Sequence, residues 1–324
     1  MNTLYKHESK RPVNTTSDDC SSLMSTKSTF DFRSQFVAMA SDCEVRLAGV
    51  SAARAQTLAA LAIAEVRRIE TKYSRYRPDS VVSQINAAAG HDAPVAIDSE
   101  TAQLLAFATQ LFQLSGGLFD ATSGVLRHAW DFKVGRKPTA QQLADILPCI
   151  GWDHVQWNDQ TARLLRKGME LDFGGFGKEY AADRAATLLA KEGAQHGWVN
   201  LGGDIRVIGP QPDGSPWSMG IRNPRRDDAV IASIPISSGA LASSGDYERF
   251  FIEGEQRFCH ILNPKTGWPA QHWQSISVIA PLCVAAGAMS TTAMLKGPDA
   301  IAFLEGQGVS YLAVDADGHV LRSA

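Results

Sequence analysis

The sequence lacks the features of membrane-spanning and nucleic-acid-binding chains. No apolar run approaches the roughly 20 residues that a membrane-spanning helix needs. The formal net charge of −3 over 324 residues offers no basic surface for a nucleic acid. Five cysteines without paired spacing are typical of a reduced compartment and not of a disulfide framework. We therefore expect no membrane span and no nucleic-acid partner.

The first thirty residues also lack the apolar core of an export signal, and they are rich in Ser, Thr, Lys and Asp. No hydrophobic segment precedes Cys20, which argues against a lipoprotein cleavage site. We expect residues 1–30 to form a disordered N-terminal tail, residues 31–324 to form one domain, and the protein to be cytoplasmic.

Helical and strand patterns cover the rest of the chain. Apolar residues recur at helical spacing over 52–72 and 101–114, and the second helix is expected to end at Gly116 and Gly117. Residues 154–165 predict a hairpin that turns at Asn158 and Asp159. Further strands are predicted over 43–49, 198–209, 217–224, 229–236, 239–252, 256–264 and 275–280, with helices at about 285–295 and 299–305 and a strand pair around 315–318. Strands that follow strands favour an α+β fold of antiparallel sheets with packed helices.

The stretch LDFGGFGKEYAADRA, residues 171–185, places a glycine-rich turn before a helical pattern. A P-loop would need a glycine where Asp172 stands and a hydroxyl where Glu179 stands. The spacing of a dinucleotide-binding turn is missing as well. Glycines at a helix start still let the backbone approach an anion. The alternative is a plain strand-to-helix turn with a surface lysine, Lys178.

Six further blocks accompany this stretch. They read SRYRPDSVVSQIN, GGLFDATSGVLRHAW, VNLGGDIRVIG, ASSGDYER, CHILNPKTGWP and AAGAMSTTAML. Together the seven blocks resemble the ApbE family, the FAD:protein FMN transferases, over about residues 35–320. The resemblance implies an α+β fold of antiparallel sheets and helices that is related to the T-fold group. It also implies transfer of FMN from FAD to a Thr or Ser hydroxyl of a client flavoprotein, with release of AMP, assistance from Mg²⁺ and a D-x-x-[ST]-G-[AS]-T segment in the client.

The resemblance assigns a site as well. It implies Lys178, Asp246 and His260 as catalytic residues. Lys178 is expected beside the pyrophosphate, and His260 is the candidate general acid or base because imidazole titrates near neutral pH. The residues implied to bind FAD are Met39, Tyr76, Asn86, Phe119, Asp120, Asp172, Gly175, Lys178, Asp183, Gly203, Ser244, Gly245, His260 and Ile261. Structural alternatives stay open for several of them, such as a core tyrosine at Tyr76 and a surface acid at Asp183.

The metal ligands depart from the family pattern. By resemblance, Thr291 and the backbone of Gly175 bind Mg²⁺, but the family's aspartate position is Gly287. Three outcomes stay open: another carboxylate such as Asp246 replaces the missing one, the metal depends on FAD phosphates and carbonyls, or the protein binds FAD without transferring it. Glu179, where the family has glycine, adds an acid beside Lys178.

Three cysteines, Cys43, Cys259 and Cys283, lie in or beside these blocks. They are either small buried hydrophobic residues or a thiol cluster near the site. Three functions are therefore open: an FMN transferase, an FAD pyrophosphatase that yields FMN and AMP, and an FAD-binding protein without transferase activity.

Overall fold

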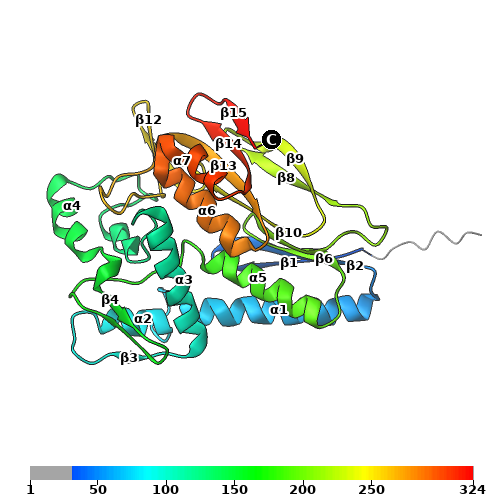
Figure 1. Cartoon of the computed structure of the whole chain (residues 1–324), viewed down its shortest axis with the longest axis horizontal. Helices are drawn as coiled ribbons and strands as arrows, with labels where there is room; N and C mark the ends of the chain where they lie inside the picture. The colour runs from blue at the N-terminus through cyan, green and yellow to red at the C-terminus, as the bar shows by residue number, and fades with distance from the viewer. Residues whose placement is uncertain (1–30, 324) are drawn as a thin grey trace, which may run out of the picture.

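A central sheet of eight strands organises the molecule, which we describe from a computed structural model for residues 31–323 (Figure 1). The predicted disordered tail, residues 1–30, lies outside the described residues. The strand order is β1-β2-β6-β7-β10-β13-β14-β15, and all neighbours are antiparallel. The strands are β1 (Asp31–Ala38), β2 (Ser41–Ala48), β6 (His196–Leu201), β7 (Asp204–Gly209), β10 (Gly239–Gly245), β13 (Trp273–Ala280), β14 (Ser310–Asp315) and β15 (Val320–Arg322). The predicted α+β class is confirmed.

Helices cover one face of this sheet. They are α1 (Ala52–Tyr73), α5 (Gly177–Lys191), α6 (Cys283–Lys296) and α7 (Ala300–Gly306), close to the helices expected at 52–72, 285–295 and 299–305. The apolar stripe of α1, including Leu58 and Val66, is buried, and the Ser51 side chain caps its start by accepting from the N–H of Arg54. α5 packs against α1, β6 and β7, and α6 packs against β10 and β13. These contacts bring the first turn of α5 and the middle of α6 to the same region of the sheet.

The hairpin of β8 (Trp217–Asn223) and β9 (Arg226–Ile236) covers the other face. Strand alternation explains the division, because successive side chains point to opposite faces. On β6, Val199 and Leu201 belong to the core beneath the helices, whereas Trp198 belongs to a second core with Trp217 of the hairpin. The sheet is therefore buried on both faces in this region.

A smaller lobe surrounds α2 (Val81–Ala87) and α3 (Ser99–Ser115). Its sheet joins β3 (Val95–Ala96), β5 (Thr161–Leu164) and β4 (Val155–Trp157), and the hairpin predicted at Asn158 is confirmed. The Asn158 side chain accepts from the N–H groups of Gln160 and Thr161, which fixes the turn. Gly116 ends α3 in the left-handed conformation, with φ of 68°.

Short helices and a second hairpin complete the chain. They are α4 (Ala140–Ile146), the 3₁₀ turns η1 (Ser123–His128), η2 (Leu147–Cys149), η3 (Trp152–His154) and η4 (Gly297–Asp299), and strands β11 (Phe250–Glu253) and β12 (Gln256–Cys259). Within residues 31–323, no helix combines the length and the apolar character needed to cross a membrane.

Candidate functional site

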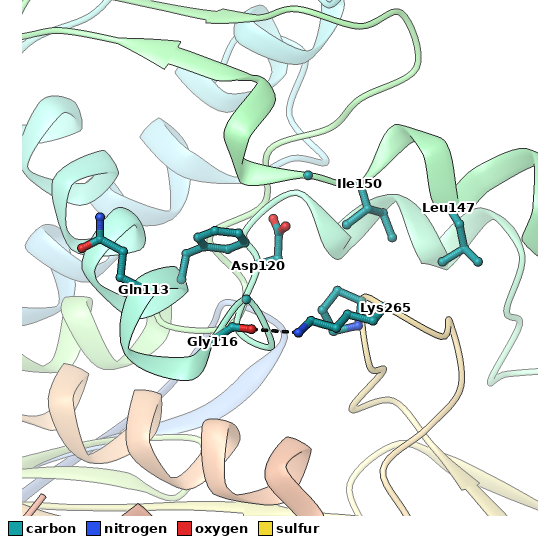
Figure 2. A pocket seen from close by; sticks show the side chains of 10 residues that line it. Gln113, Gly116, Asp120, Leu147, Ile150 and Lys265 are labelled. Carbon is teal, nitrogen blue, oxygen red and sulfur yellow. Dashed lines mark hydrogen bonds between the residues drawn. The ribbon is translucent and has the colours of Figure 1, made fainter.

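A cavity of about 500 Å³ opens beside the end of α3, between Gly116, Ile150 and Lys265 (Figure 2). The ammonium of Lys265 donates to the carbonyl of Gly116 at 2.9 Å. Asp120 is the only residue of the predicted FAD site that lines it. Lys178 is not among the lining residues, so the reacting groups must be sought elsewhere.

The buried side chain of Phe176 fixes the position of the glycine turn before α5. Phe176 is fully buried, with its ring centroid 5.1 Å from that of Phe173 and 6.3 Å from that of Phe119. A side chain at Gly175 would place its Cβ 2.8 Å from the Phe119 ring, so only glycine fits there. Within residues 31–323 no side chain caps the start of α5; the N–H of Gly177 donates to the carbonyl of Phe173 at 2.6 Å, and the N–H groups that follow it in the first turn point toward the end where an anion can bind.

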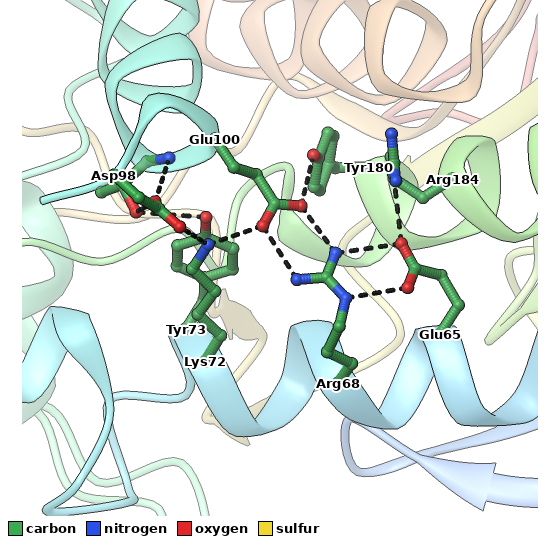
Figure 3. Close-up of polar contacts among 9 residues, drawn as sticks. Glu65, Arg68, Lys72, Tyr73, Asp98, Glu100, Tyr180 and Arg184 are labelled. Carbon is green, nitrogen blue, oxygen red and sulfur yellow. Dashed lines mark hydrogen bonds and ion pairs between the residues drawn. The ribbon is translucent and has the colours of Figure 1, made fainter. Parts of the chain in front are cut away.

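A set of charged side chains holds this end of α5 in place (Figure 3). The carboxylate of Glu100, at the start of α3, accepts from Arg68 and Lys72 of α1 and from the Tyr180 hydroxyl of α5. The Arg68 hydrogen bonds hold the pKa of Glu100 well below its usual range. Three helices are thereby joined at Tyr180, two residues after Lys178.

Lys178 forms an ion pair with Asp204, whose carboxylate is buried at the start of β7. Burial disfavours the Lys178 charge, but the nearby charges of Asp204 and Glu179 outweigh this and raise the pKa of Lys178 above its ordinary value. Asp204 follows a turn in which Gly202 and Gly203 have φ of 61° and 97°. This turn places the Asp204 carboxylate beside Lys178. The glycines are required because such angles strain other residues.

Glu179 is the next residue, and it is 7% exposed. Its side chain lies against Gly287 of α6: a Cβ at that position would be 2.6 Å from Cγ and 2.7 Å from Oε1 of Glu179. The other carboxylate oxygen, Oε2, is buried and has no hydrogen-bond partner. Burial, reinforced by the charge of Asp204, raises the pKa of Glu179.

Hydroxyl groups connect β10 to α6 beside these acids. The Ser244 hydroxyl lies 2.8 Å from the hydroxyls of both Ser290 and Thr291. The preceding residue, Ser243, donates its N–H to Asp204 at 3.2 Å. Gly245 follows, and a Cβ there would lie 2.2 Å from the Tyr247 ring. The structure thus brings Lys178, the Asp204 carboxylate and the predicted ligand Thr291 into one connected region.

His260 follows β12, and its backbone N–H donates to the backbone carbonyl of Arg249 at 3.0 Å. Its Nδ1 is buried without a hydrogen-bond partner. Burial lowers the pKa of His260 to about 4, and the positive charges of Arg249 and Lys178 act in the same direction. The imidazole is therefore neutral near pH 7 and able to accept a proton.

Asp246, predicted to be catalytic, is held by arginine. Its two oxygens accept from Arg225 at 2.6 and 2.8 Å, and Arg257 lies at 3.8 Å. Glu179, and not Asp246, is the carboxylate beside Gly287. Of the three outcomes left open, replacement of the missing acid by another carboxylate therefore points to Glu179 more than to Asp246.

Three other predicted residues bind backbone groups. Asp183 accepts from the N–H groups of Cys283 and Val284, both at 2.9 Å, and so caps the start of α6. Asn86 makes two hydrogen bonds to the backbone of Leu171, and Asp120 accepts from Thr122 and Trp152. Ile261 is 7% exposed within the core. These contacts fix the side chains in place, and Asp120 also lines the cavity beside α3.

The edge of the glycine turn is exposed. Tyr76 is 75% exposed, which excludes a core position, and the Arg75 guanidinium lies 4.9 Å from its ring centroid. Arg75 also pairs with Asp172, which accepts from the N–H of Gly174 at 2.9 Å. Met39, in the β1–β2 turn, has φ of 52° and donates its N–H to Glu70.

Sequence reasoning missed three participants: Arg75, Asp204 and Arg225. Asp204 and Arg75 stand inside the quoted blocks, so the motifs offered a signal for both. Arg225 stands in NPRRDD between strands, and no pattern there indicates a partner 21 residues away.

The three cysteines near the motif blocks behave as small buried hydrophobic residues. Cys43, Cys259 and Cys283 are at most 4% exposed, and burial raises the pKa of each thiol. Among residues 31–323, the group of His, Cys, Asp and Glu side chains close enough to share a metal is Asp315, Asp317 and His319, which includes no cysteine.

Comparisons with known proteins identify the family. The ApbE family model matches residues 39–313. The chain is 32% identical over 273 residues to the FAD:protein FMN transferase of Haemophilus influenzae, covering 80% of this chain and 79% of that protein. It is 31% identical over 278 residues to the FAD:protein FMN transferase of Treponema pallidum, with coverages of 79% and 76%.

Solved structures give the same result. The crystal structure of the ApbE protein of Thermotoga maritima matches with a TM-score of 0.83 at 32% identity, over 91% of this chain and 97% of that one. The flavinyl transferase ApbE of Pseudomonas stutzeri matches with a TM-score of 0.80 at 27% identity, over 91% and 95% of the two chains. On sequence and on fold, this chain belongs to the ApbE family.

Proposed function

We propose that this protein transfers the FMN part of FAD to a threonine or serine hydroxyl of a client flavoprotein and releases AMP. The observation that carries the proposal is the connection of distant blocks around Lys178. Lys178 pairs with Asp204, Asp204 accepts from Ser243, and the next residue, Ser244, contacts Thr291. Relatives named FAD:protein FMN transferase support the same activity.

In this proposal, Lys178 and the N–H groups in the first turn of α5 bind the FAD pyrophosphate. A bond forms between the client hydroxyl oxygen and the phosphorus of the FMN phosphate, and the bond from that phosphorus to the AMP oxygen breaks. Neutral His260 accepts the hydroxyl proton at Nδ1, the ring nitrogen that has no partner of its own. AMP leaves as the anion, next to the positive charge of Lys178.

The donors available suit Mg²⁺, which prefers oxygen ligands and few carboxylates. The Thr291 hydroxyl and the Gly175 carbonyl are the predicted ligands, and the orphaned Oε2 of Glu179 is a further buried oxygen close to Gly287. The cation, when bound, neutralises negative charge on the pyrophosphate.

The test uses purified protein, FAD, Mg²⁺ and a client domain with a D-x-x-[ST]-G-[AS]-T segment. We expect the intact mass of the client to increase by the mass of one FMN phosphoryl ester, and expect no increase when the acceptor Thr is replaced by Val. Release of FMN and AMP without client labelling would instead indicate a pyrophosphatase. Tight FAD binding with neither product would leave a binding protein.

The compartment is a separate part of the proposal. The four cysteines within residues 31–323 are free thiols, which suits a reducing compartment such as the cytoplasm. Localisation of a tagged full-length chain by fractionation tests this directly, and recovery from an oxidising compartment would contradict it.

A further inference from the structure

Gly287 occupies a position where glycine is costly. It lies inside α6, where glycine is less favourable than alanine, and its φ is not positive. The backbone therefore gives no reason for glycine. The reason is space, because any side chain at 287 would overlap Glu179 at 2.6 to 2.9 Å.

Glu179 fills that space with a carboxyl group that forms no ion pair with the described residues. It is more than nine-tenths buried, and its Oε2 has no hydrogen-bond partner. Asp204 adds a second buried carboxylate to the same site, and Lys178 is the ammonium paired with Asp204. If both acids were ionised, the two carboxylates and one lysine would leave one negative charge, and burying that charge without a cation is strongly unfavourable.

A hydroxyl oxygen lies on the same face of α6 as Gly287. Thr291 is four residues after Gly287 on α6, and residues at this spacing are neighbours on one helix face. Side chains on a helix lean toward its N-terminus, so Thr291 leans toward Gly287, the residue against which Glu179 lies. Its hydroxyl is fixed by the Ser244 hydroxyl at 2.8 Å.

We propose that Glu179 of α5 supplies the carboxylate ligand of the divalent cation, together with the Thr291 hydroxyl, and that Gly287 is glycine in order to admit it. The inference rests on the proposed function for the identity of the site. It assigns the acid to a different helix from the one on which the family pattern places it. The two departures from that pattern are then one change, in which the acid stands at 179 instead of 287 and the glycine stands at 287 instead of 179.

The experiment titrates the full-length protein with Mn²⁺, as a spectroscopically visible stand-in for Mg²⁺, and follows free Mn²⁺ by electron paramagnetic resonance. It is run without client, first without and then with FAD. We expect Glu179→Gln to weaken Mn²⁺ binding at least about tenfold. Glu192→Gln, at the other end of α5 and paired with Arg54 at the surface, is the matched control and should bind as the unmodified protein does.

A reciprocal exchange separates ligation from folding. Gly287→Asp alone should lower thermal stability, because the new side chain overlaps Glu179. Glu179→Gly combined with Gly287→Asp should recover both stability and Mn²⁺ binding. Unchanged Mn²⁺ affinity in a folded Glu179→Gln or Glu179→Gly variant would overturn the inference.

The outcome is independent of transfer activity. If the unmodified protein binds Mn²⁺ through Glu179 but never labels a client, the proposed function fails while the ligand assignment stands. If it labels the client yet binds no Mn²⁺ with or without FAD, the ligand assignment is wrong while the function stands.

Discussion

At the scale of single residues, Lys178 carries two roles that can be separated. It pairs with buried Asp204, and it is the cation proposed for the pyrophosphate. Replacing it by Met should lower the transfer rate by about 10²- to 10³-fold, as for the loss of one charge-stabilising group. Steady-state assays of client labelling measure this, and Lys191→Met, in the exposed last turn of α5, is the control.

The same substitution leaves the Asp204 carboxylate buried without a partner. Breaking a buried ion pair typically lowers the free energy of unfolding by about 3–5 kcal/mol. We expect a smaller loss here, because 26% of the Lys178 side chain is exposed. Adding Asp204→Asn should restore much of the urea midpoint but none of the transfer activity. Recovery of activity in the double variant would show that Lys178 acts only through Asp204.

His260 makes stability depend on pH. Its folded-state pKa of about 4 lies below the ordinary 6.5, so between these values the unfolded chain binds a proton that the folded protein does not. This contribution is present above pH 6.5 and is lost as the pH falls toward 4. Because the side chain is only half-buried, we expect it to amount to roughly 1–3 kcal/mol.

Urea unfolding at pH 7, 5.5 and 4.5 measures this contribution. The free energy of unfolding should fall less across the series in His260→Gln than in the unmodified protein. His91→Gln, at an exposed position, controls for the loss of one histidine. Equal pH dependence in His260→Gln and the unmodified protein would contradict the lowered pKa.

At the scale of elements, the junction of α5 and α6 is set by Asp183. Its carboxylate satisfies the first two N–H groups of α6 and pairs with Arg206 at 3.1 Å. Asp183→Ala should cost about 1–2 kcal/mol, the usual range for a lost helix cap, and Asp183→Asn should cost less because it keeps one acceptor oxygen. Urea midpoints measure the loss.

Amide hydrogen exchange locates the same effect. The amides of Cys283 and Val284 should exchange faster in Asp183→Ala, because their acceptor is gone. Unchanged exchange at both amides would mean that Asp183 acts elsewhere, for example on a bound ligand.

Most helices and strands could be predicted from the local sequence pattern, but β1 could not. Only alternate residues of β1 are half-buried, and Val37 is 68% exposed, so its apolar signal is weak. The strand exists because all eight residues pair with β2. Pairing with a neighbour is a tertiary effect that a local window does not contain.

The site divides in the same way. Motif residues such as Lys178 and Thr291 could be named from the blocks in which they stand. The contact between Glu179 and Gly287 joins two helices far apart in the chain, and the Arg225–Asp246 pair joins the β8–β9 turn to the segment after β10. Each residue alone looks like an ordinary surface charge or a helix glycine, so only the fold could give these partners.

At the scale of the whole molecule, the two faces of the sheet separate stability from chemistry. The helices that carry Lys178 and Thr291 cover one face, and the β8–β9 hairpin covers the other. Trp217 anchors that hairpin: its indole N–H donates to Gly209 at 2.8 Å, and Arg46 lies 4.7 Å from its ring centroid.

Trp217→Ala should therefore destabilise the protein by about 3–5 kcal/mol, as large-to-small changes at buried aromatic residues do. Transfer activity per folded molecule should stay unchanged at a temperature where the variant is fully folded. Differential scanning calorimetry and client labelling measure the two effects. A large loss of activity in fully folded protein would mean that the two faces are coupled.

The overlap of Glu179 with position 287 also limits how this arrangement could have arisen. In the conformation seen here, a Cβ at 287 would lie 2.6 to 2.9 Å from the Glu179 side chain, so an acid at 287 and a glutamate at 179 cannot both keep these positions. Single substitutions that convert one arrangement into the other must therefore pass through a crowded intermediate or one without an acid. The effect of a substitution at 179 or at 287 therefore depends on the residue at the other position. Substitutions found to be tolerated at 287 in one relative are expected to be tolerated only in chains that have the same residue at 179.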